Sequence, residues 1–190
     1  MYKLFRFTHA ELQPLLDEVS VLESSTDFGS GLINHRIYLE QSKSYMDSFL
    51  APHVAGFGKE FGWPEELKVF RAQKNLRLED YWVNFMGPGA CTPIHSHGGC
   101  ISWCLWLRVP YMREDELTAA PFIPEGNNIN GDFAFHWVTD RGIKTQPMRV
   151  DRTWEGTLMM WPAYLHHSVF PYYSTNELRV SVAGNYWFDV

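Results

Sequence analysis

The spacing of apolar residues changes along this chain, and the change separates a helical first part from a second part rich in strands. Near the start, apolar residues recur three and four positions apart behind Thr8-His9-Ala10-Glu11, which has the pattern of a helix capping box. This pattern predicts a helix over residues 9–20. A polar, glycine-bearing stretch follows, and residues 31–39 are expected to form a short strand.

A second helical pattern runs from Tyr45 to Phe61. Pro52 lies inside it and is expected to break or kink the helix, because proline removes a backbone donor and its ring clashes with the preceding turn. Gly62-Trp63-Pro64 is expected to end the helix. We therefore predict that residues 1–75 are mainly helical support for the rest of the chain.

From about Lys74 onward, short apolar runs alternate with turn residues, which is typical of an all-β sandwich or closed barrel. Residues 101–109 are nearly all apolar or aromatic, as expected for a strand buried on both faces. Residues 111–131 form a long, turn-rich segment that we expect to cover a substrate. The predicted strands are 76–78, 80–86, 101–109, 132–138, 148–153, 157–161, 167–170 and 178–187.

Length and charge narrow the classes of protein. A chain of 190 residues fits one domain with a sizeable core, so we predict a single domain over 1–190 whose β core spans 76–190. The net charge of −6 argues against general nucleic-acid binding, which normally requires a basic face. No apolar run is long enough to cross a bilayer, and the first residues lack the apolar core of a signal peptide. We therefore expect a cytoplasmic protein that does not bind membranes.

The first candidate for chemistry is Pro93-Ile94-His95-Ser96-His97, which precedes two glycines. On an extended backbone His95 and His97 point to the same side, because side chains alternate along a strand. Two neutral imidazoles held side by side are half of a transition-metal site. Cys91 and Cys100 flank them, so a mixed thiolate–imidazole zinc site is an alternative, although the usual Cys-x-x-Cys spacing is missing.

A third ligand is expected from the later stretch that contains His166 and His167. Adjacent residues of a strand face opposite ways, so only one of these rings can point inward. His167 shares its face with Leu165 and Val169, and this more apolar face is the better candidate for the interior. His167 is therefore the preferred ligand.

Arg179 and Ser181 share one face of the last predicted strand. A guanidinium binds a carboxylate through two parallel hydrogen bonds, and a hydroxyl two residues away can add a third. This pair therefore indicates an anion-binding position. The alternative is an edge-strand arginine paired with an acid such as Asp80.

Taken together, these stretches resemble the His-x-His branch of the iron(II)/2-oxoglutarate-dependent oxygenases of bacteria and bacteriophages. The resemblance rests on the two-histidine stretch, on residues 156–171 with their Trp161-Pro162 pair, and on Arg179-x-Ser181. It covers about residues 81–186 and leaves out the first third of the chain. It implies a mainly β fold, a double-stranded β-helix of the jelly-roll or cupin-like type, with the N-terminal helices packed outside.

The resemblance also implies roles for individual residues. His95 and His167 would be iron ligands, and His97 stands where most of the wider superfamily has Asp or Glu. His97 could ligate the metal, could swing away and leave a position for water or another anion, or could serve the substrate; we favour ligation. The residues implied for the 2-oxoglutarate pocket are Arg179 and Ser181, which would hold the far carboxylate, and Asn84 and Trp106, which would line the pocket.

The activity implied is that of an Fe(II)/2-oxoglutarate-dependent dioxygenase, with O2 as cosubstrate and hydroxylation as the expected outcome. The host would be a bacterium, or the infected cell if a phage encodes the protein. The primary substrate, a protein residue or a small molecule, and the oligomeric state stay open. Two alternatives are a three-histidine cupin-type metalloenzyme that does not use 2-oxoglutarate and a non-catalytic jelly-roll binding module.

Several polar and aromatic residues have simpler explanations than chemistry. Tryptophans placed like Trp103, Trp106 and Trp161 are more often part of the core than a platform for the substrate. The three cysteines are expected to be small buried groups. The histidines without visible partners are expected to be surface or capping residues; they are His9, His35, His53 and His136.

Overall fold

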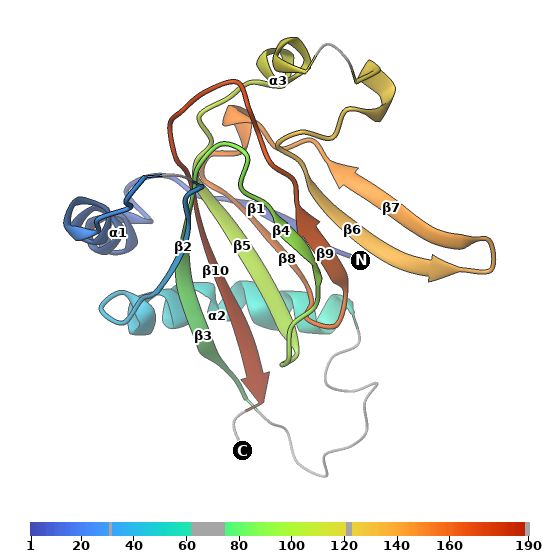
Figure 1. Ribbon diagram of the computed structural model, residues 1–190. Helices are drawn as coiled ribbons and strands as arrows, with labels where there is room; N and C mark the ends of the chain where they lie inside the picture. Colours follow the sequence, from blue (N-terminus) through green and yellow to red (C-terminus); the bar gives the residue numbers. More distant parts are fainter. Residues whose placement is uncertain (31, 62–74, 121–122, 189–190) are drawn as a thin grey trace.

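The protein folds around two antiparallel β-sheets that face each other (Figure 1). The computed structural model describes residues 1–30, 32–61, 75–120 and 123–188. Short 3-10 turns occur at Glu125–Asn127 and Arg152–Trp154. In chain order the helices and strands are β1 (Lys3–Arg6), α1 (Gln13–Ser25), β2 (Asn34–Tyr38), α2 (Lys43–Glu60), β3 (Leu76–Met86), β4 (Thr92–His95), β5 (Ile101–Arg108), α3 (Arg113–Ala119), β6 (Phe133–Thr139), β7 (Gly142–Met148), β8 (Thr157–Pro162), β9 (His166–Val169) and β10 (Arg179–Phe188).

The larger sheet has six strands in the order β1-β8-β5-β10-β3-β2, and the smaller sheet has four in the order β4-β9-β6-β7. This confirms the prediction of a mainly β fold. The first third of the chain contributes more than helices, because β1 and β2 form the two edges of the larger sheet. The sequence pattern predicts β2 but not β1, which is only four residues long.

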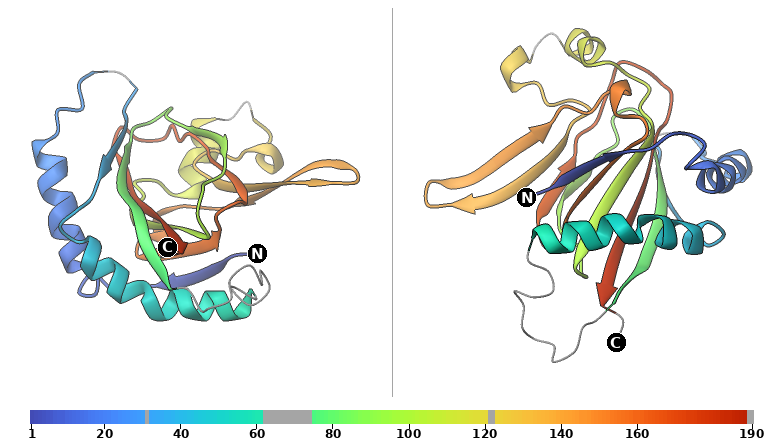
Figure 2. Two further views of the ribbon diagram at one scale, coloured as in Figure 1. Left: turned by 90° about the horizontal axis from the view of Figure 1, so that it is seen from below. Right: turned by 180° about the vertical axis from the view of Figure 1, so that it is seen from behind.

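Helices α1 and α2 lie outside the barrel, along the larger sheet (Figure 2). Leu15 of α1 and Leu50 of α2 belong to the same apolar cluster as Val83 of β3. A second cluster lies between the two sheets and includes Trp161 from the larger sheet and Phe133 from the smaller one. The barrel therefore has an inner core, and the helices add an outer core that covers the back of the larger sheet.

Strand β5 is buried on both faces. Trp103 and Leu105 belong to the outer cluster, whereas Cys104 and Trp106 belong to the inner cluster. Because successive side chains of a strand point to opposite faces, an apolar residue is required at nearly every position. This explains the continuous apolar run that predicts a buried strand at residues 101–109.

Helix α1 begins later and ends later than predicted, at Gln13 and Ser25. Thr8 and Glu11 do form the hydrogen bonds of a capping box, with the Thr8 N–H donating to Glu11 Oε2 at 2.8 Å. These bonds close a turn before the helix. Pro14 lies in the first turn of α1, where proline starts a helix well because its missing N–H has no partner there anyway.

Helix α2 runs without a break from Lys43 to Glu60, so the expected break at Pro52 is wrong. Pro52 is exposed, while the opposite face of the helix, with Leu50 and Phe57, is buried against the sheet. The expected stop at Gly62-Trp63-Pro64 lies outside the described residues. None of the described helices is long and apolar enough to cross a lipid bilayer.

Two predictions in the second half of the chain are wrong. The strand expected at 148–153 is instead β7, at Gly142–Met148, followed by a 3-10 turn. Strand β7 pairs with β6 in a hairpin that projects from the barrel (Figure 2), and its residues are mostly exposed, so it lacks the apolar alternation used to find strands. Residues 111–131 are not a plain loop, because they include helix α3.

A buried carboxylate fixes the start of α2. Glu18 on α1 is 7% exposed, and its Oε1 accepts the N–H groups of Glu40 and Gln41 at 2.9 and 3.0 Å. Its Oε2 accepts the N–H and Oγ of Ser42 at 2.8 and 2.6 Å. Burial alone raises the pKa of Glu18, but these hydrogen bonds outweigh it and lower the pKa below 4.5. The negative charge also favours the N-terminus of α2.

We expect Glu18→Gln to lower the free energy of unfolding at pH 7 by about 2–3 kcal/mol, because an amide cannot accept all four donors. Since the folded pKa lies below the ordinary 4.5, the advantage of the wild type is full above that pH and declines as the pH falls through the folded value. Urea unfolding at several pH values measures this. Asp17→Asn, an exposed carboxylate on the same helix, is the control and should change stability little. An unaltered unfolding midpoint for Glu18→Gln would contradict the assignment.

Candidate metal centre

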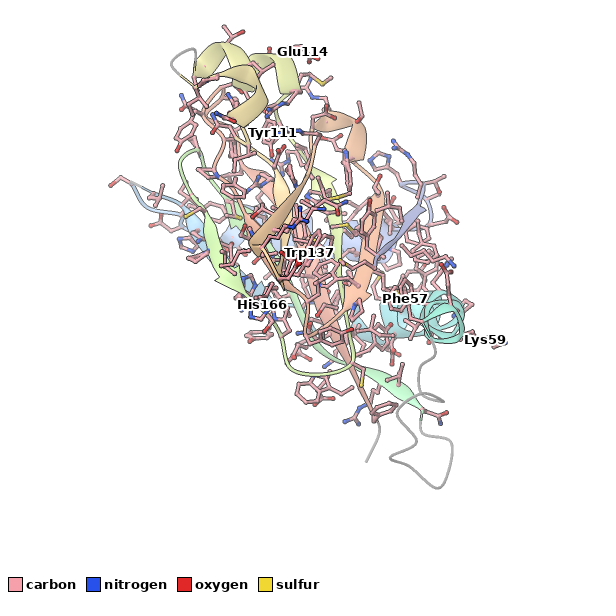
Figure 3. All side chains as sticks on the ribbon, turned by 90° about the vertical axis from the view of Figure 1, so that its right-hand side faces the viewer. Phe57, Lys59, Tyr111, Glu114, Trp137 and His166 are labelled. Atoms are coloured by element: carbon pink, nitrogen blue, oxygen red, sulfur yellow. The ribbon has the colours of Figure 1, made fainter. Side chains whose placement is uncertain are left out.

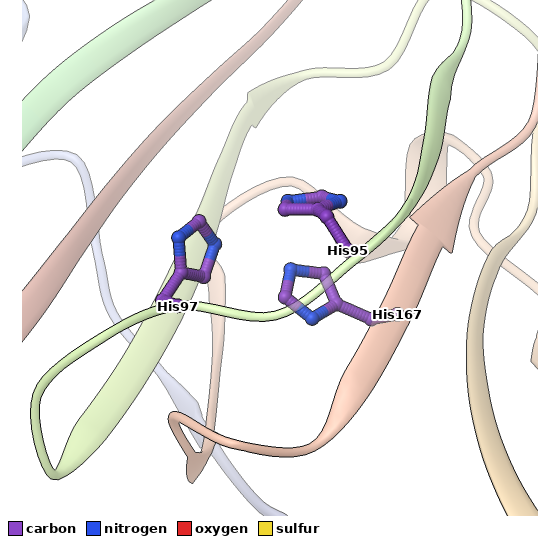
Figure 4. Close-up of side chains that lie close together, drawn as sticks. All are labelled: His95, His97 and His167. Carbon is purple, nitrogen blue, oxygen red and sulfur yellow. The ribbon is translucent and has the colours of Figure 1, made fainter.

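Three histidines converge between the two sheets. The ligand atoms of His95, His97 and His167 all lie within 4.8 Å of one another. Figure 4 shows the three rings gathered around a common point, two of them from β4 and the segment after it and one from β9. The two histidine stretches, about 70 positions apart in the sequence, therefore form one group, as the sequence predicts.

Strand pairing places two of these rings. His95 and His167 are direct cross-strand partners in the antiparallel pair of β4 and β9, and their ring centroids are 4.3 Å apart. Nδ1 of His95 lies 2.8 Å from the carbonyl of Pro93, and Nδ1 of His167 lies 3.0 Å from that of Leu165. An Nδ1–H donated to a carbonyl fixes the tautomer and leaves Nε2 with a free lone pair for a metal.

The third ring is held by the loop after β4. The His97 N–H donates to the carbonyl of Ala163 at 3.0 Å. Gly98 and Gly99 follow, and a Cβ on Gly98 would lie 2.6 Å from the ring of Trp187. Gly99 has φ +87°, a left-handed conformation that favours glycine, and a Cβ there would lie 2.8 Å from the carbonyl of Tyr186. The glycines therefore let the loop pack against the end of β10.

Burial keeps the rings of His97 and His167 neutral. The pKa of His167, which is 3% exposed, is lowered to about 3, mainly by burial. The pKa of His97 is lowered to about 4, again mainly by burial and also by the neighbouring His95. Because a metal competes with protons for the imidazole lone pair, neutral rings at pH 7 are ready to ligate.

Aromatic side chains surround the inner ring. The ring of Phe133 stacks on His167 with centroids 5.3 Å apart and an angle of 15° between the planes. Trp161 packs against the edge of the same ring at 5.0 Å. The ring centroid of Trp82 lies 5.7 Å from that of His97. These contacts exclude water and limit the orientations available to the rings.

The histidines open into a cavity with about 470 Å³ of empty space, part of it open to solvent. Of the residues predicted for the 2-oxoglutarate pocket, Asn84 and Ser181 line this cavity. Cys104 also lines it; burial raises the pKa of this thiol to about 12, so it stays protonated. Trp82 and Asn185 line the cavity too, although no sequence signal singles them out.

Arg179 lies deeper than the cavity wall. It is 2% exposed, and its guanidinium donates to Tyr111 Oη at 2.8 Å and to the carbonyls of Gly131 and Phe170 at 3.2 and 3.3 Å. Among the described residues it has no acidic partner, so the suggested pairing with Asp80 is wrong. Asp80 instead accepts hydrogen bonds from Asn185 and Trp187.

Trp106 is not among the described residues that line the cavity. It is 3% exposed and packs in the inner core, with ring centroids 6.0 Å from Phe133 and 5.0 Å from Trp154. The segment 111–131 behaves similarly, because none of its described residues lines the cavity. The structure thus does not support the expectation that this segment covers the site; Tyr111 instead contacts Arg179.

The remaining histidine and cysteine predictions have mixed outcomes. His166 is exposed on β9 (Figure 3) while His167 is buried, which confirms the inner face chosen from the sequence. The histidine group that could hold a metal contains neither Cys91, which is exposed, nor Cys100, so the thiolate–imidazole alternative is wrong. His136 is not a surface residue: it is 6% exposed and lies between Thr145 and Ser168 at hydrogen-bond distance.

The donor set fits a divalent first-row transition metal such as iron(II). Imidazole nitrogen suits iron, and three ligands on one side leave the other coordination positions for exogenous groups. The polar groups of Asn84 and Ser181 line the same cavity as the imidazoles. A small oxygen-rich molecule bound to the metal would therefore find hydrogen-bonding partners on the larger sheet.

The same fold occurs in solved structures, all distant in sequence. An oxidoreductase described as a member of the 2OG-Fe(II) oxygenase family, from Burkholderia pseudomallei, is 14% identical with a TM-score of 0.56, covering 90% of this chain and 77% of that one. The viral collagen prolyl hydroxylase vCPH from Paramecium Bursaria Chlorella virus-1, in a 2OG complex, is 11% identical with a TM-score of 0.55. The match covers 100% of this chain and 96% of that one. A Pseudomonas putida prolyl-4-hydroxylase is 14% identical with a TM-score of 0.53, and the match covers 100% of this chain and 88% of that one.

These likenesses show the jelly-roll fold. No curated protein matches the chain significantly. A family model described as "Putative 2OG-Fe(II) oxygenase" matches residues 80–185, which is more than half of the chain and includes all three histidines, Arg179 and Ser181. The protein therefore belongs to the 2OG-Fe(II) oxygenase family, whose enzymes use iron(II) and 2-oxoglutarate.

Proposed function

We propose that this protein is an iron(II)/2-oxoglutarate-dependent hydroxylase in which His95, His97 and His167 hold the metal. Arg179 and Ser181 bind the far carboxylate of 2-oxoglutarate, and Asn84 lines the same pocket. The observation that carries the proposal is the convergence of three imidazoles on one cavity, with their ligand atoms within 4.8 Å of one another.

The environment of Arg179 supports the cosubstrate assignment. Its buried cation has only neutral hydrogen-bond partners among the described residues. A buried charge without a counter-ion costs several kcal/mol, by order of magnitude. Ser181 lies two residues further along β10, on the same face, and lines the cavity. A dianion bound beside Ser181 would supply the missing negative charge.

The position of His97 supports ligation over the alternative roles. Its ring centroid lies 4.9 Å from that of His95 and 5.0 Å from that of His167. Its backbone N–H is bonded to Ala163, so the loop that carries it is fixed. A ring held this close to two ligands needs no large movement to bind the same ion.

Bound iron(II) and 2-oxoglutarate supply, with O2, the oxidising power for hydroxylation of a C–H bond. The chain contributes orientation and exclusion of water. The carbonyls of Pro93 and Leu165 aim Nε2 of His95 and His167 into the cavity, and the aromatic rings around His167 keep that side dry. The primary substrate enters the same cavity.

The metal assignment is tested by anaerobic addition of iron(II) and then 2-oxoglutarate. We expect one equivalent of metal and a weak visible charge-transfer band. His167→Ala should weaken metal binding by more than about tenfold. Removing a residue that only hydrogen-bonds to a metal ligand already lowers metal affinity about 10–100-fold, and His167 would be a ligand itself. His166→Ala is the matched control, since His166 is exposed on the same strand. Metal binding without any band would favour the three-histidine alternative that does not use 2-oxoglutarate.

The role of His97 needs its own pair of variants. We expect His97→Ala to weaken iron(II) binding by about tenfold or more, whereas His97→Asp, which restores a carboxylate ligand, should retain the metal. Calorimetric titration measures both. If His97→Ala binds iron(II) as tightly as the wild type, His97 does not ligate the metal.

The cosubstrate assignment predicts a different pattern. Ser181→Ala should raise the Kd of 2-oxoglutarate about 2–10-fold, because one neutral hydrogen bond is lost. Arg179→Lys should raise the same Kd about 10–100-fold, because charge-assisted hydrogen bonds are lost. Iron(II) affinity should stay unchanged in both. Ser174→Ala is the control, because its buried hydroxyl has no hydrogen-bond partner among the described residues and does not line the cavity.

Melting temperatures are needed beside these titrations, because Arg179 is buried. A variant that melts like the wild type and binds 2-oxoglutarate with unchanged affinity would overturn the assignment of that residue.

A further inference from the structure

One cation on the cavity face has no role in the site described so far. Arg36 lies on β2, the edge strand of the larger sheet. Strand register places it directly opposite Asn84 of β3, and Asn84 is directly opposite Ser181 of β10. Cross-strand partners share a face, so Arg36, Asn84 and Ser181 form one polar row that runs from the sheet's edge to its interior.

Arg36 reaches the cavity that contains the histidines and is one of its lining residues. Its guanidinium carbon lies 4.6 Å from the ring centroid of Trp82, a cation–π contact that holds the side chain along the cavity wall. No ion pair or hydrogen bond of its guanidinium occurs within the described part of the chain. Its donors are therefore available to a ligand.

The charge balance of the cavity makes this cation important. Apart from the histidines and the thiol of Cys104, which stays protonated, Arg36 is the one ionisable side chain among the described residues that line the cavity. Iron(II) and Arg179 together carry three positive charges and the 2-oxoglutarate dianion two negative ones, so one positive charge is left over before Arg36 is considered. Because His97 stands in place of a carboxylate, the ligands add no negative charge. Asp80 lies next to the cavity without lining it, and its Oδ2 already accepts hydrogen bonds from Asn185 and Trp187, so the mouth keeps the positive charge of Arg36.

We propose that Arg36 binds an anionic group, a carboxylate or a phosphate, on the primary substrate. This rests on the proposed function, because it assigns a substrate class to the same cavity. A guanidinium binds either anion through paired hydrogen bonds. Trp82, beneath it, and Tyr38, whose ring centroid is 6.5 Å from that of Trp82, provide an aromatic wall for the part of the substrate next to the anion.

Arg36 and the cosubstrate residues serve different anions. Strands in a sheet are about 4.8 Å apart, so the backbones at Arg36 and Ser181, two strands apart, are separated by about 10 Å. We accordingly assign the carboxylate beside Ser181 and Arg179, and the anion at Arg36, to two different molecules. The open edge of the sheet at β2 is where a further molecule enters.

The test compares two probes of nearly equal size and different charge, benzoate and benzamide, with phenyl phosphate as the phosphate arm. Binding is measured by ligand-observed NMR on protein loaded with zinc(II), which three imidazoles also bind, and with saturating 2-oxoglutarate. We expect the wild type to bind benzoate or phenyl phosphate about tenfold more tightly than benzamide, and added salt to reduce the difference. Whichever of benzoate and phenyl phosphate binds more tightly identifies the anionic group of the substrate as a carboxylate or a phosphate.

Three variants assign the preference to Arg36. Arg36→Met keeps an apolar stem against Trp82 and should remove the preference. Arg36→Lys keeps the charge without the paired geometry and should retain part of it. Arg141→Met removes an exposed arginine from the turn between β6 and β7 and should leave the preference unchanged.

Equal binding of charged and neutral probes by the wild type, or an unchanged preference in Arg36→Met, would overturn the proposal. So would an Arg36→Met protein whose Kd for 2-oxoglutarate rises, since Arg36 would then belong to the cosubstrate. A failure of the proposed function is distinguishable: the iron(II)–2-oxoglutarate band would be absent from the wild type, and the same probes on metal-free protein would still report the anion preference of Arg36.

Discussion

The antiparallel pairing of β4 with β9 is the constraint on which the rest of the structure depends. It sets His95 directly opposite His167, with ring centroids 4.3 Å apart. A shift of one residue in either strand would turn one ring to the far face, because side chains alternate. The other features of the centre, including the loop that brings His97 and the aromatic contacts of His167, are arranged around this pair.

Electrostatics gives the barrel interior its second organising feature. The imidazoles of His97 and His167 are neutral, because burial lowers their pKa values far below 7. Two cations lie at the cavity, Arg179 behind the wall and Arg36 at the edge, and the carboxylate of Asp80 is bonded to the lining residue Asn185. A protein with a net charge of −6 therefore presents a locally positive cavity, which suits anionic ligands.

The first third of the chain completes the barrel as well as supporting it. Strands β1 and β2 extend the larger sheet at both edges, and α1 and α2 cover its outer face. Glu18 joins the two helices by accepting the donors at the start of α2. Arg36 shows that this part also reaches the cavity, although the sequence resemblance to known oxygenases stops short of it.

The sequence by itself determined the mainly β character of the fold, the shared side of His95 and His97, and the inward choice of His167 over His166. Those features follow from alternation along single strands, which is a local property. Only the tertiary structure decided that Arg179 is buried among carbonyls, that Trp106 lies in the core, that the segment 111–131 does not line the cavity, and that Arg36 does. These depend on which distant strands become neighbours and in what register, and no local pattern encodes that pairing.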